Sequence, residues 1–161
     1  PYDNLGKIAS KGQINFNLTK SFQRNIFFKK KPPKSLERQD LLKNKYLKNI
    51  MLLDEKDCMA TLCNITVDTI RNSFNFLPLT PKNTIIVGGG QKNNHLINLI
   101  KKTSISNNII TGDEAGLPSD FIESELIAFL AARKYYSLPS TFPSTTGVKK
   151  NTILGDLINI R

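Results

Sequence analysis

The sequence predicts an α/β fold in which helices flank a mixed sheet. Two short runs rich in β-branched residues, 84–87 and 108–110, each end at a glycine-containing segment. Segments with apolar residues every three or four positions precede, separate and follow these runs. Such alternation is typical of a layer of parallel strands connected by helices. With 161 residues, 39% of them hydrophobic, the chain is long enough for one domain with a core and too short for two.

The N-terminal third of the chain is polar and predicts only short elements. Residues 6–14 are bounded by glycines and alternate weakly, which favours a strand or loop over a helix. Residues 17–28 predict a short helix. Pro32-Pro33 stops it, because proline donates no amide hydrogen and biases the preceding residue away from helix. Residues 39–50 are mostly charged and are predicted to be helical.

A long helix is expected at residues 54–76. Asp54 and Asp57 place carboxylates where the first turn exposes unpaired amides. The apolar stripe expected to face the core consists of Met59, Leu62, Thr66, Ile70 and Phe74. Pro78 and Pro81 follow and end the helix.

The compact α/β unit follows. It comprises a strand at 84–87, a helix at 94–102 with Leu96, Leu99 and Ile100 inward, a strand at 108–110 and a helix at 119–136. The buried stripe predicted for the last helix is Ile122, Leu126, Phe129 and Leu130. Strand 84–87 alternates too little for a strand with one wet face, so we expect it inside the sheet, covered by helices 54–76 and 119–136.

Glycines and polar side chains follow both predicted strands. Gly88, Gly89 and Gly90 lack side chains and would let a ligand approach the main chain closely. An ordinary tight turn accounts for these glycines equally well. Asn93 follows them and is either a ligand contact or a helix N-cap.

The second strand leads into a segment with paired carboxylates and then into the helix that carries Glu123. Ligands of α/β proteins usually meet the carboxyl ends of strands, so Asp113, Glu114 and Glu123 are candidate binding residues. Two alternatives stay open. Asp113 and Glu114 could cap a helix N-terminus, and Glu123 could be a solvated surface carboxylate.

The net charge is +10 and the isoelectric point is about 9.7. Lysine dominates over arginine, and the interleaving of arginine with aromatic residues that is typical of nucleic-acid readers is missing. A solvated surface is therefore favoured, even for Lys29-Lys30-Lys31. A basic nucleic-acid-binding module is the alternative and would need the lysines gathered on one face.

Cys58 and Cys63 lie five positions apart in one predicted helix, and the chain has a single His. This pattern suits neither a disulfide nor a metal site, so we expect two buried, reduced thiols and a cytoplasmic protein. No apolar run approaches the roughly 20 residues that a membrane span needs. The chain begins at Pro1 without a targeting pattern, and we expect it to be a piece of a longer protein.

Motifs that share one register run nearly end to end. They are Tyr2-Asp3 with Gly6, Ala9 and Gly12; Pro32-Pro33-Lys34-Ser35 with Arg38; Asp57, Ala60-Thr61-Leu62 and Thr66; Gly88-Gly89-Gly90 with Asn93 and Leu96; Thr111, Asp113-Glu114, Gly116, Pro118, Asp120 and Glu123; and Leu138-Pro139, Pro143-Ser144, Thr146-Gly147 and Leu154-Gly155. This series resembles the C-terminal portion of the anhydro-N-acetylmuramic acid kinase family, of the actin, Hsp70 and sugar-kinase superfamily. Two departures are Gln91-Lys92, where Ala-His is frequent, and Ile127, where Phe is usual.

The resemblance implies the C-terminal lobe of an actin-like (ribonuclease H-like) ATPase fold, with the N-terminal lobe missing from this chain. It implies a role in converting 1,6-anhydro-N-acetylmuramic acid to N-acetylmuramic acid 6-phosphate with ATP and water, in cell-wall recycling. The family's catalytic base is an Asp in a Gly-Phe-Asp-Thr-Gly-Pro-Gly-Asn segment, which this sequence does not contain. No catalytic residue is therefore assigned here, and the isolated chain is expected to be inactive.

The resemblance places a sugar-contacting Glu at Glu123. From the residues themselves we expect Gly88, Gly89, Gly90 and Asn93 to bind nucleotide, and Asp113 and Glu114 are further candidates for substrate binding. ATP and the anhydro sugar are the expected ligands, and Mg²⁺ is expected to bind mainly through the missing lobe. Neither nucleic acid nor a membrane is an expected partner. A non-catalytic interaction domain derived from a kinase is a further alternative, and the oligomeric state, a homodimer included, is left open.

Overall fold

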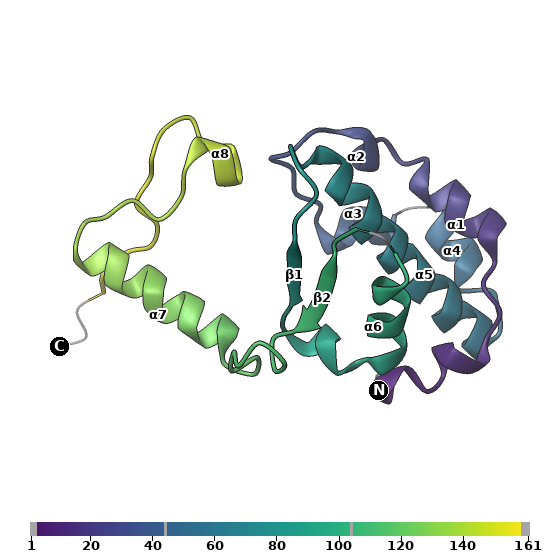
Figure 1. Ribbon diagram of the computed structural model, residues 1–161. Helices are drawn as coiled ribbons and strands as arrows, with labels where there is room; N and C mark the ends of the chain where they lie inside the picture. Colours follow the sequence, from purple (N-terminus) through teal and green to yellow (C-terminus); the bar gives the residue numbers. More distant parts are fainter. Residues whose placement is uncertain (1–2, 44, 104, 159–161) are drawn as a thin grey trace.

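The computed structural model describes residues 3–43, 45–103 and 105–158 and combines helices with a small parallel sheet, so the α/β prediction is confirmed (Figure 1). Its longer elements are α1 (Phe16–Gln23), α5 (Glu55–Ser73), β1 (Asn83–Ile86), α6 (Asn94–Lys101), β2 (Asn108–Thr111) and α7 (Ile122–Tyr135). The shorter helices are α2 (Ile26–Lys29), α3 (Arg38–Leu42), α4 (Lys45–Ile50) and α8 (Pro143–Thr146). Single 3₁₀ turns are η1 (Asn4–Gly6), η2 (Ala9–Lys11), η3 (Phe74–Phe76) and η4 (Gly89–Lys92).

Helices α1 to α6 and the two strands form what we call the main body. Helix α5 runs through its middle and, with η3, confirms the helix predicted at residues 54–76 (Figure 1). Its N-cap is Asp54, whose carboxylate accepts hydrogen bonds from the main-chain amides of Lys56 and Asp57 at 2.9 and 3.3 Å. These bonds, the one from Asp57 foremost, lower the pKa of Asp54 below its ordinary value.

The predicted apolar stripe of α5 is only partly right. Thr66 is exposed, whereas the buried side chains are Cys58, Ala60, Thr61, Ile65 and Val67. The reason is that α5 is covered on more than one face. One core cluster joins it to α1 and α4 through Phe22, Leu47, Ile50, Cys58 and Ile65. A second joins it to α6 and the sheet through Val67, Ile100, Ile105 and Ile109.

The segment at residues 6–14 is a loop that contains the 3₁₀ turn η2 and then runs along α5, so the loop alternative is correct and the strand alternative is wrong. Main-chain donors fix it there: the amide of Gln13 donates to Asp57 Oδ1 at 2.6 Å, and the amide of Asn15 donates to Thr61 Oγ1 at 3.0 Å. The backbone at Gly12 lies so close to the carbonyl of Lys56 that a β-carbon would overlap it.

Each of the two helices predicted before α5 is divided in two. The side chain of Asn25 accepts from the amide of Phe27 at 2.9 Å and begins α2 separately from α1. The region predicted as one helix at 39–50 forms α3 and α4. Between the two pairs, Lys34 Nζ donates to the carbonyl oxygens of Phe27 and Phe28 at 3.0 and 3.3 Å and lies over the rings of Phe27 and Phe76. Lys34 thereby connects α2 to η3, the 3₁₀ turn that follows α5.

Strands β1 and β2 pair in parallel, with Ile85 opposite Ile110, and α6 connects them. Helices α5 and α6 cover one face of this pair. The expectation that β1 is internal is wrong for the described residues, because β1 pairs there with β2 alone. Its outer face is open, and Ile85 and Val87 are 46% and 40% exposed. The apolar run correctly indicated a strand suited to burial, but parallel strands need cover on both faces that these residues do not supply.

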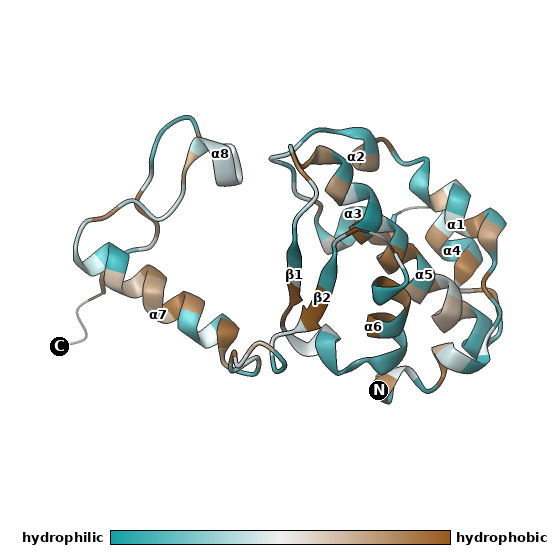
Figure 2. Cartoon of the chain, viewed as in Figure 1, coloured by the Kyte–Doolittle hydropathy of each residue, from teal (hydrophilic) through white to brown (hydrophobic). Residues whose placement is uncertain are grey.

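Helix α7 exists as predicted, but its predicted stripe is not buried. Within the described part of the chain it extends away from the main body and does not cover the sheet (Figure 1). None of its side chains is buried there, and Leu126 and Phe129 are 54% and 55% exposed. Apolar residues nevertheless lie along most of the helix (Figure 2). A helix that is apolar on several sides is suited to an interior position, so the spacing indicated the helix correctly but not its neighbours.

The two cysteines are free thiols, as expected, although only Cys58 is buried and Cys63 is half-buried. Burial, reinforced by the charge of Asp3, raises the pKa of Cys63 to about 11. Burial and the charge of Asp54 raise the pKa of Cys58 as well. Among the described stretches, none of the helices combines the length and the apolar character needed to cross a bilayer.

Candidate functional site

The segments that follow β1 and β2 lie side by side, at the carboxyl ends of the two strands. The amide of Gly112 donates to the carbonyl of Ile86 at 2.7 Å and extends the pairing into the loops. A β-carbon at Gly112 would lie 2.7 Å from Ser119 Oγ and 3.0 Å from Val87 Cγ1, so a larger residue does not fit there. The structure therefore brings together the two polar segments that the sequence indicated separately.

The segment Gly88-Gly89-Gly90, which we call the glycine loop, leaves open space beside its main chain. Gly88 has a φ of 80°, which favours glycine, and a β-carbon at Gly88 or Gly89 would meet no atom within 4 Å. A pocket of about 580 Å³ borders this loop. It is lined by Asp3, Asn4, Leu5, Met59, Gly89, Gly90, Lys92, Asn93 and Leu96. The positive φ of Gly88 suits a tight turn, and the open space beside Gly88 and Gly89 leaves room for a ligand, so nucleotide binding by this loop stays a prediction.

Asn93 serves as the N-cap of α6, because its side-chain oxygen accepts from the amide of Leu96 at 2.9 Å. The same residue borders the pocket of the glycine loop. Gly6, in the 3₁₀ turn η1, has its Cα against the side chain of Asn93 and leaves no room for a β-carbon. The N-cap alternative is therefore correct for the Asn93 side chain, and its contact with a nucleotide stays a prediction.

Asp113 is held by two side chains that the sequence analysis did not select. Gln91 Nε2 donates to Asp113 Oδ1 at 3.1 Å, and the amide of Asp113 donates back to Gln91 Oε1 at 3.3 Å. Ser119 Oγ donates to the same Asp113 Oδ1 at 2.8 Å. Gln91 and Ser119 are only 5% and 7% exposed. The signals available in the sequence were a polar residue directly after three glycines and a hydroxyl at the first residue of the helix predicted at 119–136.

Glu114 forms hydrogen bonds with Thr111 within the turn after β2 and does not cap α7. Its Oε2 accepts from the amide of Thr111 at 2.6 Å, and its own amide donates to Thr111 Oγ1 at 3.2 Å. Lys101 Nζ lies 3.4 Å from the other carboxylate oxygen. The hydrogen bond from the Thr111 amide is the main reason that the pKa of Glu114 is lower than usual. Its carboxylate therefore has a structural role in this turn.

A second pocket, of about 550 Å³, lies between α6 and the turn after β2. It is lined by Leu5, Gln91, Lys92, Asn94, Ile97, Asn98, Lys101, Thr111, Asp113 and Glu114. Leu5 and Lys92 border both pockets, which makes the two cavities neighbours. The candidate site consists of these two pockets.

Glu123 lies in the first turn of α7 and is exposed. It does not line either pocket of the candidate site. The structure therefore brings the glycine loop, Asn93, Asp113 and Glu114 together but leaves Glu123 outside the cavities. Its contact with a sugar stays a prediction.

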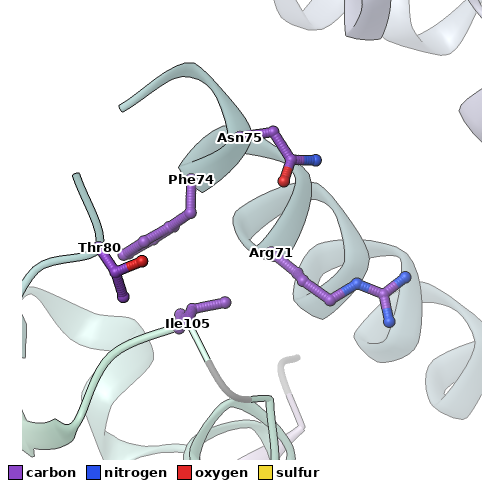
Figure 3. Close-up of a pocket in the computed structure, with 5 residues that line it drawn as sticks. All are labelled: Arg71, Phe74, Asn75, Thr80 and Ile105. Carbon is purple, nitrogen blue, oxygen red and sulfur yellow. The ribbon is translucent and has the colours of Figure 1, made fainter. Parts of the chain in front are cut away.

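A further pocket, of about 270 Å³, lies where α5 ends, and it is lined by Arg71, Phe74, Asn75, Thr80 and Ile105 (Figure 3). The side chain of Arg71 extends away from Thr80 and Ile105 in Figure 3. Its guanidinium pairs instead with Asp68 at 2.9 Å. Because its polar groups do not converge on the cavity, this pocket is not the candidate site.

Comparison with known proteins gives a consistent result. The model of the family described as "Anhydro-N-acetylmuramic acid kinase" matches residues 1–159. Proteins of that name from Hydrogenovibrio crunogenus and Zymomonas mobilis subsp. mobilis are 34% and 33% identical over 158 and 147 residues, which cover 96% and 91% of this chain. A Coxiella burnetii protein of the same name is 31% identical over 156 residues.

The matched segments amount to 43%, 39% and 42% of the Hydrogenovibrio, Zymomonas and Coxiella proteins. The chain thus spans about two fifths of the length of the curated relatives it matches. Because the family model extends over nearly all of its residues, the chain belongs to the anhydro-N-acetylmuramic acid kinase family.

Proposed function

We propose that this chain is the C-terminal lobe of a cytoplasmic kinase with an actin-like, ribonuclease H-like fold. The reaction is the conversion of 1,6-anhydro-N-acetylmuramic acid to N-acetylmuramic acid 6-phosphate with ATP and water, in peptidoglycan recycling. The observation that carries the proposal is the pair of strand-end loops, one rich in glycine and one rich in carboxylates, that meet beside two pockets. Membership of the kinase family supports it.

The experiment that tests this function uses an assembled kinase, by which we mean this chain joined to the N-terminal part of the Hydrogenovibrio crunogenus relative. Formation of N-acetylmuramic acid 6-phosphate that requires both ATP and the anhydro sugar is the expected result. An assembled kinase that folds and yields no product when both ligands are present would overturn the proposal.

The site residues divide into two tasks. The main chain of the glycine loop contacts ATP, with Asn93 beside it, and Asp113 accepts hydrogen bonds from substrate hydroxyls. Mg²⁺, when bound, neutralises charge on the transferred phosphate, and no residue of this chain is assigned to it. This lobe binds and orients ligands, whereas the proton-accepting Asp lies on the other lobe.

Gly89→Val in the assembled kinase is expected to raise the KM for ATP by at least tenfold. The side chain would occupy the space that the nucleotide uses, since a β-carbon at Gly89 meets no protein atom within 4 Å. For the same reason the substitution should leave folding intact, and urea unfolding provides this control. An unchanged KM for ATP in a stable variant would remove the glycine loop from the nucleotide site.

Glu123→Gln is expected to weaken activity by more than tenfold while the protein stays folded. A charge-assisted hydrogen bond to a sugar hydroxyl contributes about 1.5 to 3 kcal/mol, and the exposed side chain has little structural role. Glu125→Gln, in the same turn of α7, is the matched control and should keep normal kinetics. Equal kinetics in both variants would make Glu123 a solvated surface residue.

The two alternative functions receive less support. The lysine-rich N-terminal part of the chain lies within residues 1–159, which match the kinase family, so its charge requires no separate function. A basic nucleic-acid-binding module would still bind DNA at raised salt, and a heparin or DNA column distinguishes it from the kinase. A non-catalytic interaction domain would bind neither ATP nor the sugar in the assembled protein.

A further inference from the structure

We propose that Gln91 is a positioning residue that orients Asp113 toward a hydroxyl group of a bound ligand. The inference rests on the proposed function, and it assigns a role to a buried side chain that the kinase proposal leaves unused. The ligand chemistry is a sugar hydroxyl, supplied either by the ribose of ATP or by the anhydro sugar. Kinetics with each ligand varied in turn distinguish the two sources.

The contact between Gln91 and Asp113 is reciprocal. The amide of Gln91 donates from Nε2 to the Asp113 carboxylate and accepts at Oε1 from the Asp113 main chain, at 3.1 and 3.3 Å. One side chain therefore fixes both the backbone and the side chain of the same residue. Gln91 is 5% exposed, and among the described residues both hydrogen bonds recorded for its side chain go to Asp113.

The carboxylate of Asp113 is held in an asymmetric way. Its Oδ1 accepts from Gln91 and from Ser119, the latter at 2.8 Å. Its Oδ2 accepts no hydrogen bond from the residues that the structure describes. Asp113 is exposed and lines the pocket of about 550 Å³. An ionised carboxylate with one oxygen anchored and the other open is an oriented acceptor for a hydroxyl donor.

Gln91 also joins two loops that belong to different strands. It lies in η4, after β1, whereas Asp113 follows β2, and the tight packing at Gly112 keeps these loops in contact. The Gln91 amide fixes the distance between the glycine loop and the carboxylate. A site built on both loops depends on that distance, because small displacements of positioning groups cost large factors in rate.

Gln91→Met tests the role, because methionine has a similar size but neither donates nor accepts as the amide does. In the assembled kinase we expect a rise of about tenfold in the KM of one ligand, either ATP or the anhydro sugar. Gln39→Met, on the exposed face of α3, is the matched control and should behave as wild type. The urea midpoint of each variant is measured in parallel to confirm that it is folded.

A double variant separates positioning from general support of the fold. If Gln91 acts through Asp113, then Gln91→Met should add little to the loss caused by Asp113→Ala. Losses that multiply in the double variant would overturn the proposal. A normal KM for both ligands in a folded Gln91→Met variant would overturn it as well.

Gln91→Glu provides a pH-dependent readout that does not depend on Gln91→Met being stable. Two adjacent carboxylates repel each other at neutral pH, whereas the introduced carboxyl group, once protonated, can donate a hydrogen bond as the amide does. The ratio of variant to wild-type kcat/KM should therefore rise as the pH falls, and a flat ratio would contradict the proposed contact. An inactive wild-type assembled kinase would instead overturn the proposed function, and this inference with it.

Discussion

Residues 1–161 alone are expected to form no detectable N-acetylmuramic acid 6-phosphate from ATP and the anhydro sugar. The sequence contains no Gly-Phe-Asp-Thr-Gly-Pro-Gly-Asn segment, so the chain lacks the Asp that would accept a proton from water. General base catalysis contributes about 10² to 10⁴ in rate, and positioning by the proposed second lobe would contribute more. The two losses together place the reaction below detection.

Mass spectrometry of the product, with ATP omitted in a parallel reaction, is the measurement. The N-terminal part of the Hydrogenovibrio crunogenus relative, added as a separate chain, should restore some turnover if the two parts dock. A matched reaction with that added part alone controls for its own activity. Turnover by residues 1–161 alone, at a rate near that of an intact relative, would show that the catalytic groups lie within this chain.

Gly12→Ala is expected to destabilise the main body by about 3 kcal/mol, the upper end of the usual cost of overpacking. The new β-carbon would overlap the carbonyl of Lys56 and approach the amide nitrogen of Asp57 to 2.8 Å. These are backbone atoms in the first turn of α5, which cannot rotate away as a side chain can. Since small domains are stable by only about 5 to 15 kcal/mol, the loss is a large fraction of the total.

Urea unfolding of the isolated chain measures this effect as a lower midpoint with an unchanged slope. Gly89→Ala is the matched control, because its β-carbon meets no atom within 4 Å, and its stability should stay within about 0.5 kcal/mol of wild type. If Gly12→Ala and Gly89→Ala unfold at the same urea concentration, then the segment around η2 is not packed against α5 as described.

The sequence predicted local elements better than the surroundings of those elements. Helices α5 and α6 and both strands begin and end within a few residues of the expected positions, because apolar spacing and proline stops are local signals. The predictions that α7 is buried and that β1 is internal were wrong. Apolar residues indicate that a segment is suited to burial, but they do not show which other segment covers it.

The candidate site shows the same division. The glycine loop and the carboxylates of Asp113 and Glu114 were predicted at strand ends, and the parallel pairing of β1 and β2 brings them together. Gln91 and Ser119 were missed, because their importance arises from hydrogen bonds to Asp113 across 22 and 6 positions of sequence. Hydrogen bonds between side chains of irregular segments leave no periodic pattern in a single sequence.

Helix α5 contributes to both core clusters, through Cys58 and Ile65 on one side and Val67 on the other. Neither cluster can lose its packing without removing support from the helix that the other requires, so we expect the main body to unfold as one cooperative unit. Helix α7 contributes to neither cluster, so we expect its amide hydrogens to exchange with solvent through local opening at a much lower free energy. The chain therefore combines a cooperative body with a helix that lies outside the two core clusters.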